Sequence, residues 1–202
     1  MATTEQVPAV QTNRGAHLAD PAALGLGGFA LTTFVLSVAN TNVIPIAVTP
    51  VVFGLALAYG GIAQFAAGIW EFAKGNTFGA TAFCSYGGFW ISYWYLTGHT
   101  DLSGAGASVD EGVGLYLLAW AIFTGYMTIA ATKTNTAVLT VFVLLTITYI
   151  LLAIGNFASS SGWIHIGGWV GVATALAAWY ASLAVVANFT HKRTVFPVGP
   201  LE

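Results

Sequence analysis

The chain has only five Lys and Arg residues among its 202 residues, and their positions restrict its fold more than any other feature. They alternate with apolar segments at roughly 21–40, 50–72, 77–97, 111–132, 136–157 and 163–187. A membrane-spanning helix needs about 20 apolar residues, and Lys and Arg collect on its cytoplasmic flank. Each cation lies in a terminal segment or an even-numbered gap: Arg14, Lys74, Lys133, Lys192 and Arg193. The pattern predicts an all-α integral membrane protein with six transmembrane helices and both termini in the cytoplasm.

Composition supports this class and excludes others. Hydrophobic residues make up 57 % of the chain and charged residues 6 %, against about 25 % charged in a soluble domain. A net charge of −2 gives no reason to expect a nucleic-acid partner. Cys84 is the only cysteine, so we expect no disulfide framework, no metal site and no cofactor. We interpret residues 1–19 as a flexible cytoplasmic tail, 20–190 as the transmembrane transport domain and 191–202 as a second cytoplasmic tail.

Three of the predicted helices begin with a capping pattern. Asp20 and Thr49 each precede a proline, which favours a side-chain cap followed by proline at the first helical position. Residues 108–111 read SVDE, a capping-box pattern. The third gap also holds Asp101, Asp110 and Glu111, which the charge rule places outside the cell. These acidic residues form either an acidic mouth or an ordinary solvated loop.

Charged side chains are almost absent from the predicted spans, which excludes several kinds of membrane protein. The spans hold no Lys, Arg or Asp, and Glu71 lies at the cytoplasmic end of the second span. A voltage sensor needs an Arg ladder and a retinal protein needs a buried Lys, so neither fits. A membrane-embedded enzyme also lacks a paired carboxylate, a His cluster or a Ser/His/Asp set. A channel or transporter for a small, weakly held solute remains.

The second span has one organised face. Gly61, Gln64, Gly68 and Glu71 recur at spacings that place them on one side of a helix. Small residues allow helices to approach closely, and an amide is costly in lipid unless it has a partner or faces water. The face is therefore either a helix–helix contact or one wall of a solute pathway. We favour the pathway, because this face is small and polar.

Two polar residues near predicted exterior helix ends have two readings each. His165 is either a hydrogen-bonded structural residue or a group that couples proton movement to transport. Asn156 is either a helix-end capping group or a part of the pathway.

Three stretches of the chain form motifs. Residues 20–29 read DPAALGLGGF. Residues 59–64 read YGGIAQ and lead through Gly68 and Glu71 to GNTFG at 75–79, SYG at 85–87 and FW at 89–90. The third stretch joins LAIGN at 152–156 to His165, Gly168 and Trp169. In order and spacing, these stretches resemble the acetate uptake transporter family, which contains microbial succinate–acetate permeases and fungal ammonia/acetate transporters. The family's entry signature reads NPAPLGL followed by Phe, so this chain departs from it at Asp20 and Ala23.

The resemblance implies a six-helix protomer in a homohexamer, with a pathway for acetate or succinate in each protomer. It also implies a constriction of a Phe, a Tyr and a Leu, which match Phe29, Tyr86 and Leu145. Each of the three lies eight or nine residues into a predicted outward-running helix, or about 12–14 Å of rise. Three residues at one depth can form a ring.

A carboxylate that crosses an apolar ring must be neutralised by a proton or held by polar groups that replace water. We therefore expect a weak substrate site on each side of the ring, with candidates Thr32, Thr33, Asn40, Gln64, Asn76 and Thr81. Glu71 is either the site of a coupled proton or a solvated interface carboxylate. We expect the protein in the plasma membrane, with acetate, succinate and lipid as its partners. An ammonia, small-neutral-solute or ion channel is the alternative function.

Overall fold

The computed structural model describes residues 18–106 and 108–201, and their regular structure is helical. The expected flexible tail, with Arg14, lies mostly outside the described residues. In chain order the helices are α1 (Ala22–Asn40), η1 (Ile46–Val51), α2 (Val52–Leu57), η2 (Ala58–Ala63), α3 (Gln64–Lys74), α4 (Thr77–His99), η3 (Ser103–Ala105), α5 (Ser108–Ala131), α6 (Thr136–Phe157) and α7 (Ser161–His191).

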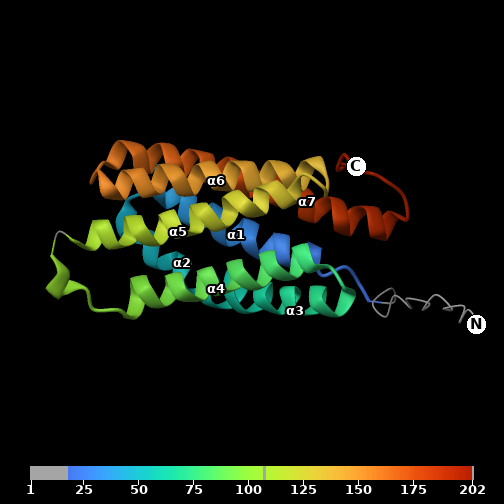
Figure 1. Cartoon of the computed structure of the whole chain (residues 1–202), viewed down its shortest axis with the longest axis horizontal. Helices are drawn as coiled ribbons and strands as arrows, with labels where there is room; N and C mark the ends of the chain where they lie inside the picture. Colours follow the sequence, from blue (N-terminus) through green and yellow to red (C-terminus); the bar gives the residue numbers. More distant parts are fainter. Residues whose placement is uncertain (1–17, 107, 202) are drawn as a thin grey trace, which may run out of the picture.

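Five stretches of the described chain are long and apolar enough to cross a membrane: α1, the continuous stretch from η1 to α3, α5, α6 and α7. The all-helical membrane class is thus confirmed. The third predicted span, which is α4, is not among the five although it has 23 residues. Its many Tyr, Trp, Gly and Ser residues lower its mean hydropathy. Figure 1 shows α4 lying alongside the other long helices.

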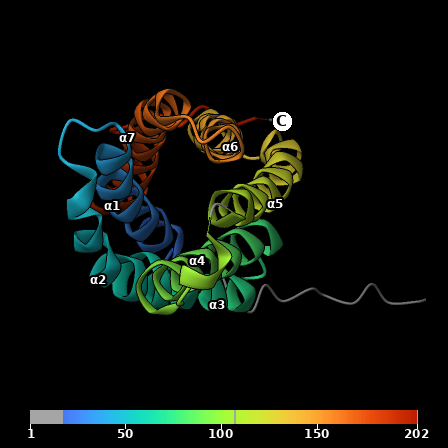
Figure 2. The same cartoon turned by 90° about the vertical axis from the view of Figure 1, so that its left-hand side faces the viewer.

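The long helices run back and forth along one axis (Figure 1). We call the end where residues 18 and 201 lie the terminal end, and the opposite end, with the α4–α5 connection, the distal end. Seen from the distal end, α1, α7, α6, α5 and α4 surround the axis, with α2 and α3 beside α1 and α4 (Figure 2). Neighbouring pairs include α1 with α7, α7 with α6, α6 with α5, and α3 with α4.

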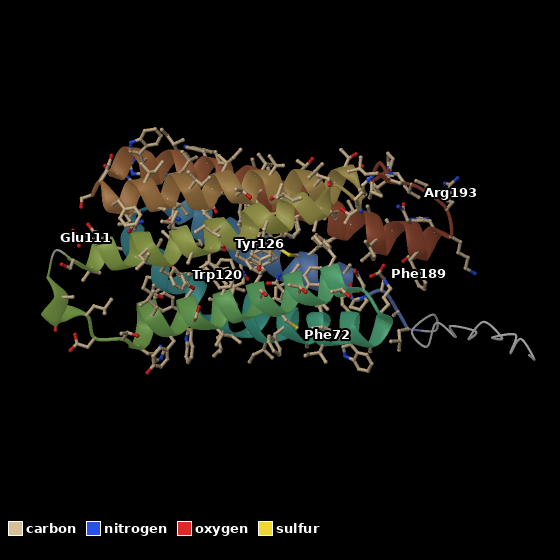
Figure 3. The ribbon with its side chains drawn as sticks, viewed as in Figure 1. Phe72, Glu111, Trp120, Tyr126, Phe189 and Arg193 are labelled. Atoms are coloured by element: carbon tan, nitrogen blue, oxygen red, sulfur yellow. The ribbon has the colours of Figure 1, made fainter. Side chains whose placement is uncertain are left out.

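The two ends of the bundle differ in charge. All the described Lys and Arg residues lie at the last residue of a helix that ends at the terminal end, or just after one, as Arg193 does in Figure 3. Asp101, Asp110 and Glu111 lie at the distal end. The backbone N–H of Ser103 donates to the Asp101 carboxylate over 2.9 Å and lowers the pKa of that carboxyl. The distal end is therefore acidic.

The helix starts follow the predicted caps in part. The Asp20 carboxylate accepts from the Ala22 N–H over 3.0 Å, as predicted. The Thr49 cap is wrong, because a 3₁₀ helix precedes α2 and the Thr49 hydroxyl donates to the Ile46 carbonyl. At 108–111 the helix begins earlier than predicted, with Ser108 as its first residue.

The second predicted span contains an irregularity that the sequence does not announce. Its middle, η2, is a π-helical turn. A Cβ on Gly60 would lie 2.6 Å from the Thr32 hydroxyl and 2.8 Å from Cδ1 of Trp90, so only glycine allows this close approach to α1 and α4. Similarly, a Cβ on Gly68 would meet the backbone N of Cys84 at 2.5 Å.

Residues 194–201, which we call the C-terminal strap, fold back over the terminal end. The Asn188 side chain accepts from the Val195 and Phe196 N–H groups over 2.7 and 3.0 Å, and donates to the Phe196 carbonyl over 2.9 Å. Further along, the Thr136 N–H donates to the Gly199 carbonyl over 2.7 Å. The strap therefore joins the end of α7 to the start of α6, an order that we do not predict for residues 191–202.

Candidate functional site

Phe29, Tyr86 and Leu145 lie in one buried cluster at the centre of the bundle. They come from α1, α4 and α6, and each side chain is only 3 % exposed. The Phe29 and Tyr86 ring centroids are 5.7 Å apart. We call these three residues the central layer. The three residues lie at similar distances from the starts of their predicted helices, and the structure places them in the same buried cluster.

A cavity of about 250 Å³ lies on the distal side of the central layer. Phe29 and Leu145 form part of its wall, and it extends to Asn40 and Asn156 near the distal ends of α1 and α6. Most of its other wall residues are aromatic or aliphatic: Leu36, Ile46, Phe89, Trp90, Tyr93, Leu96, Val113, Tyr116, Leu117, Tyr149, Leu152 and Ile164. This distal cavity suits a small solute with a short apolar part.

A second cavity, of about 420 Å³, lies at the terminal end. Its wall includes the apolar Leu26, Phe78 and Phe142 together with polar groups from α3, from α7 and from the turns that precede α1, α4 and α6. Val198 of the C-terminal strap also lines it. We call this space the terminal cavity.

The central layer separates the two cavities. Phe29 and Leu145 line the distal cavity, whereas Phe142 lines the terminal cavity. The Tyr86 ring lies between them, with its centroid 5.7 Å from that of Phe29 and 6.0 Å from that of Phe142. Tyr86 therefore lies between residues of the two cavity walls.

Side chains from α5 fix Tyr86 in place. Trp120 and Phe123 pack against its ring at centroid distances of 6.1 and 5.5 Å. The Tyr86 hydroxyl is 3.0 Å from the Thr124 hydroxyl, which is fully buried. Large aromatic side chains therefore fill the interface between α4 and α5 around Tyr86.

Polar groups with free hydrogen-bonding capacity lie around the distal cavity. Thr33 lines it, is 5 % exposed and has no hydrogen-bond partner for its hydroxyl among the described residues. Asn40 lines it as well. Asn156 donates its amide to the Leu152 carbonyl over 2.8 Å, so it does not cap the end of α6. Trp90 also lines the cavity, with an indole N–H that has no described partner.

At the terminal cavity the polar groups form a network. Glu71 is fully buried, so the reading of a solvated interface carboxylate is wrong. One Glu71 oxygen accepts from the Asn76 amide over 2.9 Å, and the other has no partner among the described residues. Asn76 also caps α4 by accepting from the Gly79 N–H over 3.1 Å. Asp20, which replaces the Asn of the family signature, pairs with Lys74 at 3.0 Å beside the same cavity.

Besides Tyr86, four candidates from the sequence line neither cavity. The Thr32 hydroxyl is buried and donates to the Gly28 carbonyl over 2.8 Å, and Thr81 is half-buried on α4. Gln64 is 1 % exposed and packs against α1 beside Gly28, on a face that also holds the buried Gly61 and Gly68. This position supports the helix-contact reading of Gln64 over the pathway reading that we favour from the sequence. The fourth, His165, is half-buried near the start of α7.

Sequence reasoning missed three residues that belong to this region: Thr124, Phe142 and Trp90. Each lies in a long apolar helix among other residues of its kind, so its spacing carries no signal. Only the rotation of each helix about its axis brings these side chains to the centre. The motif FW at 89–90 includes Trp90 but indicates no role for it.

The comparisons with known proteins agree with this geometry. The GPR1/FUN34/yaaH family matches residues 3–202. The chain belongs to this family. Among its relatives is the ammonia transport outward protein 2 of Saccharomyces cerevisiae, which is 44 % identical over 90 % of this chain. Another is the succinate-acetate/proton symporter SatP of Escherichia coli, which is 40 % identical over 90 % of this chain. The chain spans 66 % of the length of the yeast relative and 96 % of the bacterial one.

A solved structure of the GPR1/FUN34/yaaH family has the same fold. The bacterial acetate channel SatP superposes with a TM-score of 0.83 and 38 % sequence identity, over 90 % of this chain and 99 % of that one. The helices of this chain are therefore arranged as in a solved bacterial acetate channel.

Proposed function

We propose that this protein moves small carboxylates, acetate and succinate, across the plasma membrane along a pathway within each protomer. The observation that carries the proposal is the pair of cavities separated by Phe29, Tyr86 and Leu145. A thin apolar barrier between two wider spaces allows a small solute to cross in one step. Membership of a family that contains a succinate-acetate/proton symporter supports this substrate class.

The substrate meets different groups on the two sides of the barrier. On the distal side, the unpaired Thr33 hydroxyl and the Asn40 amide offer hydrogen bonds to a carboxyl group. On the terminal side, Asn76 and Lys74 line the cavity. Both sites should bind the solute weakly, because few polar groups surround it. Weak binding suits transport, since a tightly held solute would leave slowly.

Glu71 is the proposed site of the coupled proton. It is fully buried, one of its oxygens lacks a described partner, and it lines the terminal cavity. A buried carboxyl group in a membrane span marks a functional position more often than a structural one. Glu71 would take the proton of the acid in that cavity, and the substrate would leave as the carboxylate.

The proposed orientation places the terminal end in the cytoplasm. Because both ends of the described chain lie there, the number of crossings is even, and α4 is the sixth crossing beside the five apolar stretches. Lys74, Lys133, Lys192 and Arg193 lie at this end, and Lys and Arg favour the cytoplasmic side. We further propose a homohexamer. Its support is the family resemblance together with large exposed apolar side chains such as Trp70, Ile129 and Trp169, which need lipid or another copy as cover.

Labelled acetate uptake into proteoliposomes, with and without an inward proton gradient, tests the proposal. We expect uptake well above that of protein-free vesicles, competition by succinate, and accumulation driven by the gradient. Glu71→Gln should slow gradient-driven accumulation several-fold, because the acid then has no buried carboxylate to take its proton at the terminal cavity. Absence of acetate uptake by the assembled parent protein would refute the function.

Ammonia conduction is the second candidate, since one relative is named an ammonia transport outward protein and an apolar barrier passes neutral solutes. Methylamine uptake that acetate does not inhibit would favour it.

A further inference from the structure

The hydroxyl of Tyr86 has a fixed direction of hydrogen bonding. The Thr124 hydroxyl lies 2.8 Å from the Trp120 carbonyl, one helical turn earlier, and donates its single hydrogen to it. Thr124 then has only lone pairs left for Tyr86, 3.0 Å away. Tyr86 must therefore be the donor in this pair.

This direction determines what Tyr86 can offer a passing solute. Its one hydrogen is directed at Thr124, so its oxygen retains only acceptor capacity. A carboxylate brings acceptors alone and would find no donor on Tyr86, whereas a protonated acid brings an O–H that can donate. Of the aromatic rings that pack against Tyr86, those of Phe29, Phe123 and Phe142 carry no hydrogen-bond donor. The indole of Trp120, the fourth ring, donates to the Tyr116 hydroxyl.

The surroundings of Tyr86 supply no charge to alter this selection. The titratable groups that face it are the phenols of Tyr126 on α5 and Tyr149 on α6. The charged residues of the flanking helices lie at helix ends, as Asp110 and Glu111 do on α5. A phenol ordinarily ionises near pH 10, above the pH range of the test described below.

We propose that Thr124 is a positioning residue that fixes the Tyr86 hydroxyl as a hydrogen-bond acceptor, so that the central layer passes the protonated acid in preference to the carboxylate. The inference rests on the proposed function and specifies the chemical form of its substrate. Thr124 acts through Tyr86 and lines neither cavity itself.

The test measures initial rates of labelled acetate uptake at pH 5.5, 6.5 and 7.5, with equal pH on both sides of the vesicle. The neutral fraction of acetic acid falls about tenfold per pH unit in this range, and the parent rate should fall with it. Thr124→Val removes the acceptor and frees the Tyr86 hydrogen for a carboxylate. Its ratio of rates at pH 7.5 and 5.5 should rise at least about tenfold, the effect of one hydrogen bond to a charged group. Thr124→Ser restores the acceptor and should restore the parent profile.

Thr128→Val is the matched control. Thr128 lies one turn further along α5, and its hydroxyl contacts the Thr124 carbonyl and the Thr146 hydroxyl rather than Tyr86. Its pH profile should equal that of the parent. An unchanged profile in assembled Thr124→Val, or an equal change in Thr128→Val, would overturn the inference.

Tyr86→Phe keeps the inference testable if Thr124→Val fails to assemble. It deletes the acceptor oxygen and leaves the bond from Thr124 to Trp120 in place. The rate at pH 5.5 should fall at least about fivefold with no change in the slope of the pH profile. An undiminished rate would refute the role of Tyr86. Uptake by the parent that fails at every pH would instead refute the proposed function, and this inference with it.

Discussion

Leu145 is the aliphatic member of the central layer, and its side chain is almost fully buried between the two cavities. Truncation to Ala removes three carbons from a packed position, which leaves space at the barrier. At the scale of single residues, we therefore expect the width of the layer to set which acids pass.

We predict that Leu145→Ala admits larger monocarboxylates such as butyrate, at a cost of about 2–5 kcal/mol in stability. Labelled butyrate uptake measures the effect. Ile147→Ala is the control, because Ile147 lies on the same helix but is 41 % exposed. An unchanged substrate range and rate in Leu145→Ala would mean that Leu145 is ordinary core.

Gln64 separates a packing role from a pathway role. Its oxygen is buried without a partner among the described residues, so Leu at this position should leave the free energy of unfolding unchanged or raise it by about 1 kcal/mol. Acetate uptake should keep its half-saturating concentration, because Gln64 lines neither cavity. Thermal melting and uptake are compared with those of Ile62→Leu, a change on the exposed side of the same stretch. A higher half-saturating concentration in Gln64→Leu would restore the pathway reading.

At the scale of helices, the C-terminal strap couples α6 to α7 beside the terminal cavity. Asn188 makes three hydrogen bonds to it, and Tyr180 donates to the Pro197 carbonyl over 2.7 Å. Because Val198 lines the terminal cavity, the strap also forms part of the proposed pathway.

We predict that Asn188→Ala loosens the strap. Trypsin should cleave after Lys192 and Arg193 several times faster than in the parent, since each lost hydrogen bond contributes about 1 kcal/mol. His191→Ala is the control, because His191 is exposed and lies close by in the chain. Equal cleavage rates in the two variants would show that Asn188 does not hold the strap.

Helix boundaries followed the sequence where local signals were strong. α6 runs from Thr136 to Phe157 as predicted, with Asn135 as its cap, which accepts from the Val138 N–H over 2.9 Å. η2 was not predictable, because its π-helical turn depends on contacts of Gly60 with two other helices. The three residues of the central layer could be predicted from the family resemblance and from their similar distances along their helices. The cavities did not, because helices that are apolar on every side give no periodicity from which to read which face points inward.

At the scale of the whole molecule, the separation of charge between the two ends determines the proposed orientation. Four described cations lie at the terminal end, and an acidic cluster lies at the distal end. The positive-inside rule then gives one orientation for the entire bundle.

In intact cells, with Cys84 replaced by Ser, a cysteine at Ser103 should react with a membrane-impermeant thiol reagent. A cysteine at Arg193 should react only after the membrane is permeabilised. Both positions are exposed, so access to solvent does not distinguish them. Labelling of Arg193→Cys in sealed cells would contradict the orientation.

The central claim is that carboxylates cross through the distal cavity and the central layer. Substrate protection of a cysteine at Leu36, which lines that cavity, tests it most directly. In the Cys84→Ser background, thiol modification of Leu36→Cys should abolish acetate uptake, and acetate should slow the modification. A cysteine at Tyr95, which is 59 % exposed, should show neither effect. Full uptake after complete modification of Leu36→Cys, with no protection by acetate, would contradict the account.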